Sequence, residues 1–151
     1  MAKFVYKMQS LLNIKLKLED QAKTAYGLAR AALNEEEEKL RQLIARKNQY
    51  IENKRQEMSS SINVHELTQL EHAIKSMEYR IAEQVLVVKQ AEKNVQLAQA
   101  KLENAMKERK IQEKLREHAL EDFLKEMEAA DQQEINELVT FRFGKTKERE
   151  E

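Results

Sequence analysis

Four residue types that normally shape a compact fold are missing or scarce in this sequence of 151 residues. Cysteine, proline and tryptophan do not occur, and glycine occurs twice. Without cysteine, the chain can form neither disulfides nor thiolate metal sites. Without proline, nothing forces a helix to break. Aromatic residues make up only 5% of the chain and charged residues 36%, which favours long helices over a compact globule with many turns.

Long apolar runs and an excess of charge are missing as well. No apolar run approaches the roughly 18 residues of a membrane span, and four lysines interrupt the N-terminal 20 residues, which argues against a secretory signal. This basic stretch suits either the first turns of a coiled coil or an amphipathic helix on an anionic membrane surface. The 27 basic side chains balance 27 acidic ones, so net charge gives no argument for nucleic-acid binding. The absence of cysteine leaves the redox compartment open, although it fits a cytoplasmic protein.

A regular apolar pattern is present in the second half of the chain. Apolar residues recur in alternating steps of three and four, and eleven of the twelve positions in this series are apolar. Agreement over more than five heptads is typical of a coiled-coil seam. The positions are Leu67, Leu70, Ile74, Met77, Ile81, Gln84, Val88, Ala91, Val95, Ala98, Leu102 and Ala105.

The pattern in the first half is looser. Lys15 occupies one position of the series, and two consecutive steps of four, from Ala25 through Ala29 to Leu33, predict a stutter that locally unwinds the supercoil. The predicted seam consists of Phe4, Met8, Leu11, Leu18, Ala22, Ala25, Ala29, Leu33, Leu40, Ile44, Ile51 and Met58.

A turn is predicted between these halves, within the stretch EMSSSINVHELTQLEHAI at residues 57–74. The serines at 59–61 favour turns and caps over a helix interior. Asn63 is a good N-cap, and Glu66 follows three positions later, where a capping box needs an acid. The second helix should therefore begin at about Val64.

The chain should fold back on itself at this turn. Ile62 and Leu67 suit the two positions of a hydrophobic staple, and a short connection makes two helices antiparallel neighbours, with residue n roughly opposite residue 122 − n. We predict an all-α fold, a long antiparallel two-helix coiled-coil hairpin with an extended C-terminal helix. Its parts are a first helix at 1–58, a turn at 59–63, a second helix at 64–140 and a polar tail at 141–151.

The second helix should extend past the first from about residue 121. Residues 121–140 carry seven acids against one base, Lys125. They also carry apolar residues that should have no partner within the hairpin, which usually marks an interaction site; dimerisation and fraying are the alternatives. These residues are Phe123, Leu124, Met127, Ile135, Leu138 and Val139.

Residues that carry chemistry are poorly placed for catalysis or cofactor binding. His65 and His72 are seven positions apart, whereas two ligands on one helix face are four apart. No glycine-rich phosphate loop occurs, and the carboxylates are spread over solvated helix surface with no pocket to shift their pKa values. The basic stretch 107–116 suits a solvated helix face better than a nucleic-acid site. We predict no enzyme activity, metal or cofactor.

Four segments in a fixed order resemble the FliJ family, small coiled-coil proteins of bacterial flagellar export. They are FVYKMQSLLNIKLKLED, EEEEKLRQLIARKNQY before the turn, LEHAI after it, and EINELVTFRF near the C-terminus. The resemblance implies an antiparallel coiled-coil stalk similar to the rotor shaft of rotary ATP synthases. It would bind the flagellar export ATPase ring, contact the cytoplasmic domain of the membrane export gate, and engage export chaperones. It would be a monomeric rod when free, peripherally associated with the cytoplasmic face of the cell membrane.

The resemblance also implies two contact sites. The export-gate contact would involve Leu43, Tyr50, Leu70 and Ala73. Arg46 and Met77 depart from an aromatic residue and a histidine in related proteins, and Leu70 also belongs to the predicted seam. The ATPase-ring contact would involve Phe123, Leu124, Met127, Ile135 and Leu138.

Two alternative functions are left open by the sequence. The chain could be the stalk of a virulence-type secretion system, or it could be a generic dimerising coiled-coil spacer.

Overall fold

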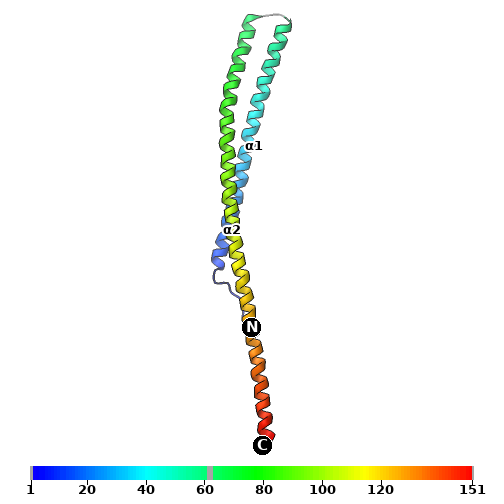
Figure 1. Ribbon diagram of the computed structural model, residues 1–151. Coiled ribbons are helices and arrows are strands. Elements are labelled where there is room, and N and C mark those ends of the chain that lie inside the picture. The colour runs from blue at the N-terminus through cyan, green and yellow to red at the C-terminus, as the bar shows by residue number, and fades with distance from the viewer. Residues whose placement is uncertain (1, 61–62, 151) are drawn as a thin grey trace. The chain divides into compact units, whose positions relative to one another are not determined.

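Two long helices make up the structure, a computed structural model that describes residues 2–60 and 63–150, with side chains up to Lys145. Helix α1 spans Gln9–Ser60 and helix α2 spans Val64–Glu150. The helices run antiparallel and pack against each other, and no strand occurs in the described part of the chain (Figure 1). The predicted all-α helical hairpin is confirmed. Neither described helix contains a stretch apolar enough to span a lipid bilayer.

The chain divides into two compact units. Residues 19–104 form the first, called here the hairpin unit, and contain the middle of α1, the turn and the first part of α2. Residues 1–18 and 105–151 form the second, called here the terminal unit. The two units are described separately below.

The hairpin unit has a small apolar core. Leu33 on α1 packs against three residues of α2, Val88, Ala91 and Val95, and each of the four side chains is at most 8% exposed. Burial of such side chains is the main term that stabilises the pair of helices. Three half-buried residues pack against this core: Tyr26, Ala29 and Leu40.

The predicted seam of α2 is confirmed. Each of its twelve positions, from Leu67 to Ala105, is buried or half-buried. The one polar position, Gln84, donates hydrogen bonds to the backbone oxygen of Glu36 at 3.0 Å and to the Glu36 carboxylate at 2.6 Å. A buried amide is tolerated here because its hydrogen-bonding groups find partners on α1.

The predicted seam of α1 is partly wrong. Six of its residues are exposed: Met8, Leu18, Ala25, Ile44, Ile51 and Met58. Fourteen of the buried and half-buried positions of α1 keep strict alternating steps of three and four, so the predicted stutter at Ala25–Leu33 is absent, and four half-buried residues, Gln9, Leu11, Glu37 and Asn53, lie outside this series. The fourteen positions are Leu12, Lys15, Glu19, Ala22, Tyr26, Ala29, Leu33, Glu36, Leu40, Leu43, Lys47, Tyr50, Lys54 and Glu57.

Charged side chains at the seam explain this error. Six of the fourteen seam positions of α1 carry Lys or Glu, which a search for apolar residues passes over. Long charged side chains can cover apolar surface with their methylene groups while their charged ends reach water or a partner. Three of the lysines pair with glutamates of α2: Lys15–Glu108 at 2.8 Å, Lys47–Glu78 at 3.6 Å and Lys54–Glu71 at 3.4 Å. These pairs agree with the predicted pairing of residue n with 122 − n to within a helical turn.

The cap at the start of α2 is confirmed. The Oδ1 atom of Asn63 accepts hydrogen bonds from the backbone N–H groups of His65 at 3.1 Å and Glu66 at 3.4 Å. These bonds satisfy donors that the first turn of a helix otherwise leaves unpaired, and α2 begins at Val64 as predicted. Ile62 lies outside the described residues, as does its predicted staple with Leu67.

The other helix ends differ from the predicted ones. Helix α1 begins at Gln9 instead of residue 1, after a turn in which the Gln9 N–H donates to the Tyr6 carbonyl oxygen at 3.1 Å. It continues to Ser60 instead of ending at 58, and the Ser59 and Ser60 hydroxyls donate to the backbone oxygen of Gln56 within the last turn. Serine hydroxyls that bond to the preceding turn are compatible with helix.

Helix α2 also continues past its predicted end. It runs to Glu150, so the helix end predicted at 140 is wrong, and residues 141–150 of the predicted polar tail belong to the helix. No proline interrupts this region, and Gly144 alone costs a helix only about 1 kcal/mol relative to alanine. A polar sequence without a helix breaker is therefore a weak signal for a helix end.

Candidate partner-binding surfaces

The N-terminal segment packs on α2 in the terminal unit. The rings of Phe4 and Phe123 have centroids 5.5 Å apart at a tilt of 53°. The guanidinium of Arg116 lies 5.7 Å from the centroid of the Phe4 ring, and the Tyr6 hydroxyl donates to the Gln112 side-chain oxygen at 3.3 Å. These contacts attach the segment that precedes α1 to the outer part of α2.

This packing changes the predicted ATPase-contact site. Phe123 was expected to have no partner within the hairpin, and its contact with Phe4 shows that this is wrong. Phe123 and Met127 are half-buried. The remaining three residues of the predicted site, Leu124, Ile135 and Leu138, are 55%, 53% and 62% exposed. The structure therefore divides the predicted site into a covered part and an open part.

The open part belongs to the last described turns of α2, residues 124–145, called here the C-terminal extension. Every described side chain from residue 128 to residue 145 is exposed. Sequence analysis placed Phe141 and Phe143 in a tail, whereas both lie on the helix and are 61% and 70% exposed. The extension thus presents five apolar side chains, Leu124, Ile135, Leu138, Phe141 and Phe143, that are each more than half exposed.

The extension is also acidic. Its acids outnumber its bases by five to three, and one of the bases, Lys145, has its Nζ atom 4.8 Å above the Phe141 ring. A helix that combines exposed apolar side chains with charge of mainly one sign suits a partner with a basic rim around an apolar groove. The acids are Glu126, Glu128, Asp131, Glu134 and Glu137.

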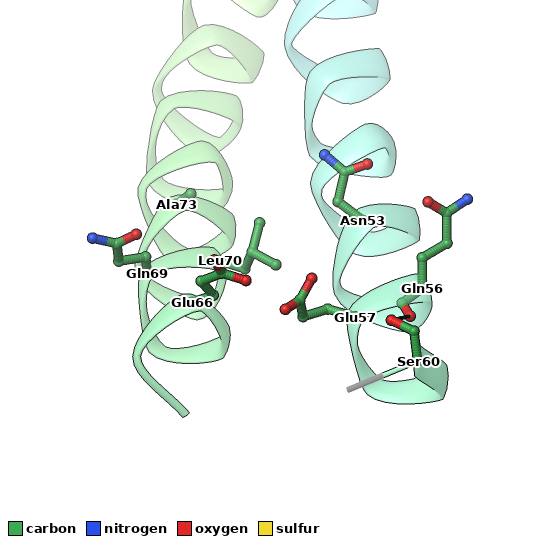
Figure 2. Close-up of a pocket in the computed structure, with 8 residues that line it drawn as sticks. All are labelled: Asn53, Gln56, Glu57, Ser60, Glu66, Gln69, Leu70 and Ala73. Carbon is green, nitrogen blue, oxygen red and sulfur yellow. Dashed lines mark hydrogen bonds between the residues drawn. The ribbon is translucent and has the colours of Figure 1, made fainter. Parts of the chain in front are cut away.

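The four predicted gate-contact residues are half-buried in the hairpin unit. Leu70 and Ala73 line one cavity of about 660 Å³ near the turn (Figure 2). Leu43 instead lines a shallow cavity of about 490 Å³ together with Val87. Tyr50 occupies an inner position of the α1 seam. The structure brings Leu70 and Ala73 together and places Leu43 at a separate depression.

Two carboxylates face each other across the cavity near the turn. Figure 2 shows Glu57 on α1 and Glu66 on α2 pointing toward one another, with Leu70 beside them. A hydrogen bond between the two side chains raises the pKa of Glu57, and partial burial and repulsion by the Glu66 charge add to this shift. A carboxyl that shares a proton with a neighbouring carboxylate holds that proton more tightly. Glu57 therefore keeps its proton to a higher pH than an isolated glutamate does, because its pKa is raised.

The pKa of Glu36, which also lies in the hairpin unit, is shifted in the opposite direction. The hydrogen bond from Gln84 lowers the pKa of Glu36, and the nearby Lys39 adds to this effect against the opposing effect of burial. Hydrogen bonds to the ionised form of a carboxyl stabilise that form.

No group of three or more His, Asp or Glu side chains within the described ranges is arranged to hold a metal ion.

Comparison with known proteins identifies the family. A sequence-family model described as Flagellar FliJ protein matches residues 4–148, a range that includes the N-terminal segment, both helices and the C-terminal extension. The search of curated proteins found no match. A solved structure of CT670 from Chlamydia trachomatis, a candidate YscO homolog, is 25% identical, covers 89% of this chain and 90% of its own, and has a TM-score of 0.49. From the family match, the chain belongs to the flagellar FliJ protein family.

Proposed function

We propose that this chain is a coiled-coil stalk of flagellar protein export that binds the export ATPase ring through its C-terminal extension. Membership of the flagellar FliJ protein family supports the export role. The observation that carries the ATPase contact is that Leu124, Ile135 and Leu138, near the end of α2, are each more than half exposed. Exposed apolar stripes of this kind usually mark sites of protein interaction.

The proposed mechanism is mechanical. Conformational changes in the ATPase ring reach the cytoplasmic domain of the export gate through the paired helices, and the chain itself catalyses nothing. The gate contact uses Leu43, Tyr50, Leu70 and Ala73, and export chaperones bind the same stalk. The protein acts in the cytoplasm, at the inner face of the cell membrane.

The exposed residues of the extension provide a contact of useful strength. Burying an exposed leucine or isoleucine contributes about 1.5–3 kcal/mol, and three such residues form a cluster large enough to act as the centre of a small interface. Acids beside them, such as Glu128 and Asp131, would pair with basic residues at the rim of the partner's groove.

The test is a binding titration of a triple variant, Leu124→Ser with Ile135→Ser and Leu138→Ser, into the flagellar export ATPase of the same organism. We expect the Kd to rise about tenfold or more and stimulation of ATP hydrolysis to fall with it. These positions are preferable to Phe123, because a change there would also release the contact with Phe4.

A matched control separates the extension from a general loss of exposed apolar surface. The control variant is Ile14→Ser with Leu28→Ser and Ile111→Ser, whose side chains are 53%, 68% and 58% exposed. It should bind the ATPase like the unmodified chain. Equal affinity of all three proteins, with helicity unchanged by circular dichroism, would show that the extension is not the ATPase contact.

A further inference from the structure

A second exposed apolar surface lies on α2 in the hairpin unit. Leu86 and Leu97 are 67% and 62% exposed. They are eleven positions apart, which is about three helical turns and places both on the same side of the helix. Lys89 and Lys93 lie between them and are also exposed. We call the surface formed by Leu86, Lys89, Lys93 and Leu97 the basic face.

Shallow depressions border Leu86 on two sides. One, of about 590 Å³, is lined by Leu86, Lys89 and Lys93 among others, and the second, of about 490 Å³, by Leu86, Val87 and Arg80. Neither Lys89 nor Lys93 forms an ion pair with another described residue. The basic face thus combines apolar contact area with two lysines that form no ion pair with a described residue, beside one acid, Glu92, which lines the same depression.

The C-terminal extension has the complementary arrangement. Leu124 and Ile135 are also eleven positions apart, and they are 55% and 53% exposed. The side chains between them include Glu128 and Asp131, both exposed. The two surfaces therefore share the spacing of their apolar residues and carry opposite charge between them.

We propose that the C-terminal extension of one copy binds the basic face of a second copy. The apolar residues coincide whichever way the two helices run. In the parallel direction Leu86 meets Leu124, and Lys93 comes opposite Asp131. In the antiparallel direction Leu86 meets Ile135, and Lys93 comes opposite Glu128. Opposite charges placed between two apolar contacts determine register as well as affinity.

This contact is weak and depends on salt. It consists of two pairs of exposed apolar residues and a few exposed ion pairs, which contribute little to affinity and are screened by salt. The inference does not rest on the proposed function. Leu124 and Ile135 take part in both contacts, however, so a partner that binds the extension competes with self-association.

Sedimentation of two charge-reversed variants tests the contact. One variant carries Lys89→Glu and Lys93→Glu, and the other carries Glu128→Lys and Asp131→Lys. The unmodified chain should gain mass with concentration between about 5 and 500 µM, because contacts of this size have Kd values on that order. Each variant alone has surfaces of like charge and should stay monomeric, with its association constant reduced about tenfold or more.

An equimolar mixture of the two variants gives the decisive result. The acidic extension of one then meets the basic face of the other, and the basic extension of the second meets the acidic face of the first. Mass should therefore increase again in the mixture and decrease at high salt. A control with Lys110→Glu and Lys114→Glu, which makes the same change of charge elsewhere on α2, should associate like the unmodified chain.

Three results would overturn the proposal. An unmodified chain that remains monomeric over the whole range shows that the contact does not form. Association of the Lys89→Glu, Lys93→Glu variant alone shows that the extension pairs with another surface, such as a second extension. A mixture that stays monomeric, with both variants helical by circular dichroism, shows that the two surfaces do not meet.

Discussion

The core residues that α2 contributes to the hairpin unit and the residues of the C-terminal extension belong to the same helix, yet they differ strongly in burial. Val88, Ala91 and Val95 are at most 8% exposed, whereas Ile135 and Leu138 are 53% and 62% exposed. Both segments carry apolar residues at helical spacing. The difference is the presence of α1 opposite the first segment, where Leu33 completes the core.

Apolar residues on one helix therefore have two different roles. Where α1 covers them, their removal from water stabilises the fold. Where nothing covers them, the same side chains add little to stability and are available for a partner. Two pairs of substitutions compare a site within the paired helices with a matched site in the extension, and a third pair compares two carboxyls within the hairpin unit.

The largest expected effect is that of Leu33→Ala. Removing a buried leucine side chain should lower the free energy of unfolding by about 2–4 kcal/mol. The matched change Leu138→Ala, at a residue that is 62% exposed, should change it by less than about 0.5 kcal/mol. Urea denaturation followed by circular dichroism measures both. Similar losses at the two sites would mean that the extension is buried in solution.

A smaller effect is expected at the two glycines. Both Gly27 and Gly144 are helical, and a Cβ added at either would meet nothing within 4 Å. Gly27→Ala should therefore stabilise the paired helices by about 0.5–1 kcal/mol. Gly144→Ala should increase local helicity without a change in the main unfolding transition, because nothing packs on this part of α2. A main transition shifted equally by both substitutions would contradict this.

The smallest effect concerns the pH dependence at Glu57. Its folded-state pKa is raised above the ordinary value of 4.5. The proton shared with Glu66 therefore stabilises the folded state fully below that ordinary value, and this contribution is lost as pH rises through the raised pKa. Glu57→Gln removes one of the two facing charges. Its melting temperature should exceed that of the unmodified chain slightly at about pH 7, and the difference should shrink in acid.

Glu36 serves as the matched control with the opposite sign. Its folded-state pKa is lowered below 4.5, so its contribution to stability is present above that value and is lost as pH falls through the lowered pKa. Glu36→Gln should therefore melt at a lower temperature than the unmodified chain at about pH 7 and approach it in acid. Melting curves that respond to pH in the same direction for both variants would contradict the assigned causes.

Sequence reasoning was most accurate where the pattern was apolar and the signal local. The twelve seam positions of α2 and the Asn63 cap were found because alternating apolar spacing and capping residues act through contacts near in sequence. The seam of α1 was partly misread because Lys and Glu residues occupy inner positions, such as Lys15 opposite Glu108. Those positions depend on partners on the other helix, which for Lys15 is 93 residues away in the chain.

In the candidate site, too, the apolar residues were predicted, whereas a contact with a distant part of the chain was not. The apolar residues of the extension were found from the sequence, since the two arms differ in length. The contact between Phe4 and Phe123 was not predicted. Phe4 lies in a segment before α1 that was expected to be helical. The helical state of Phe141 and Phe143 was not predicted, because the polar composition of the last residues is only a weak signal for the end of a helix.

The sequence by itself determined that this chain forms two long antiparallel helices, where they turn, and which face of α2 is apolar. Those features follow from helical periodicity, a helix cap and the absence of proline, all of which act locally. Only the tertiary structure decided which face of α1 is buried, which charged residues belong to the seam, and which apolar residues at the end of α2 are covered. Each of these depends on whether a side chain meets a partner from a distant part of the chain, because burial is a property of the packed pair of helices.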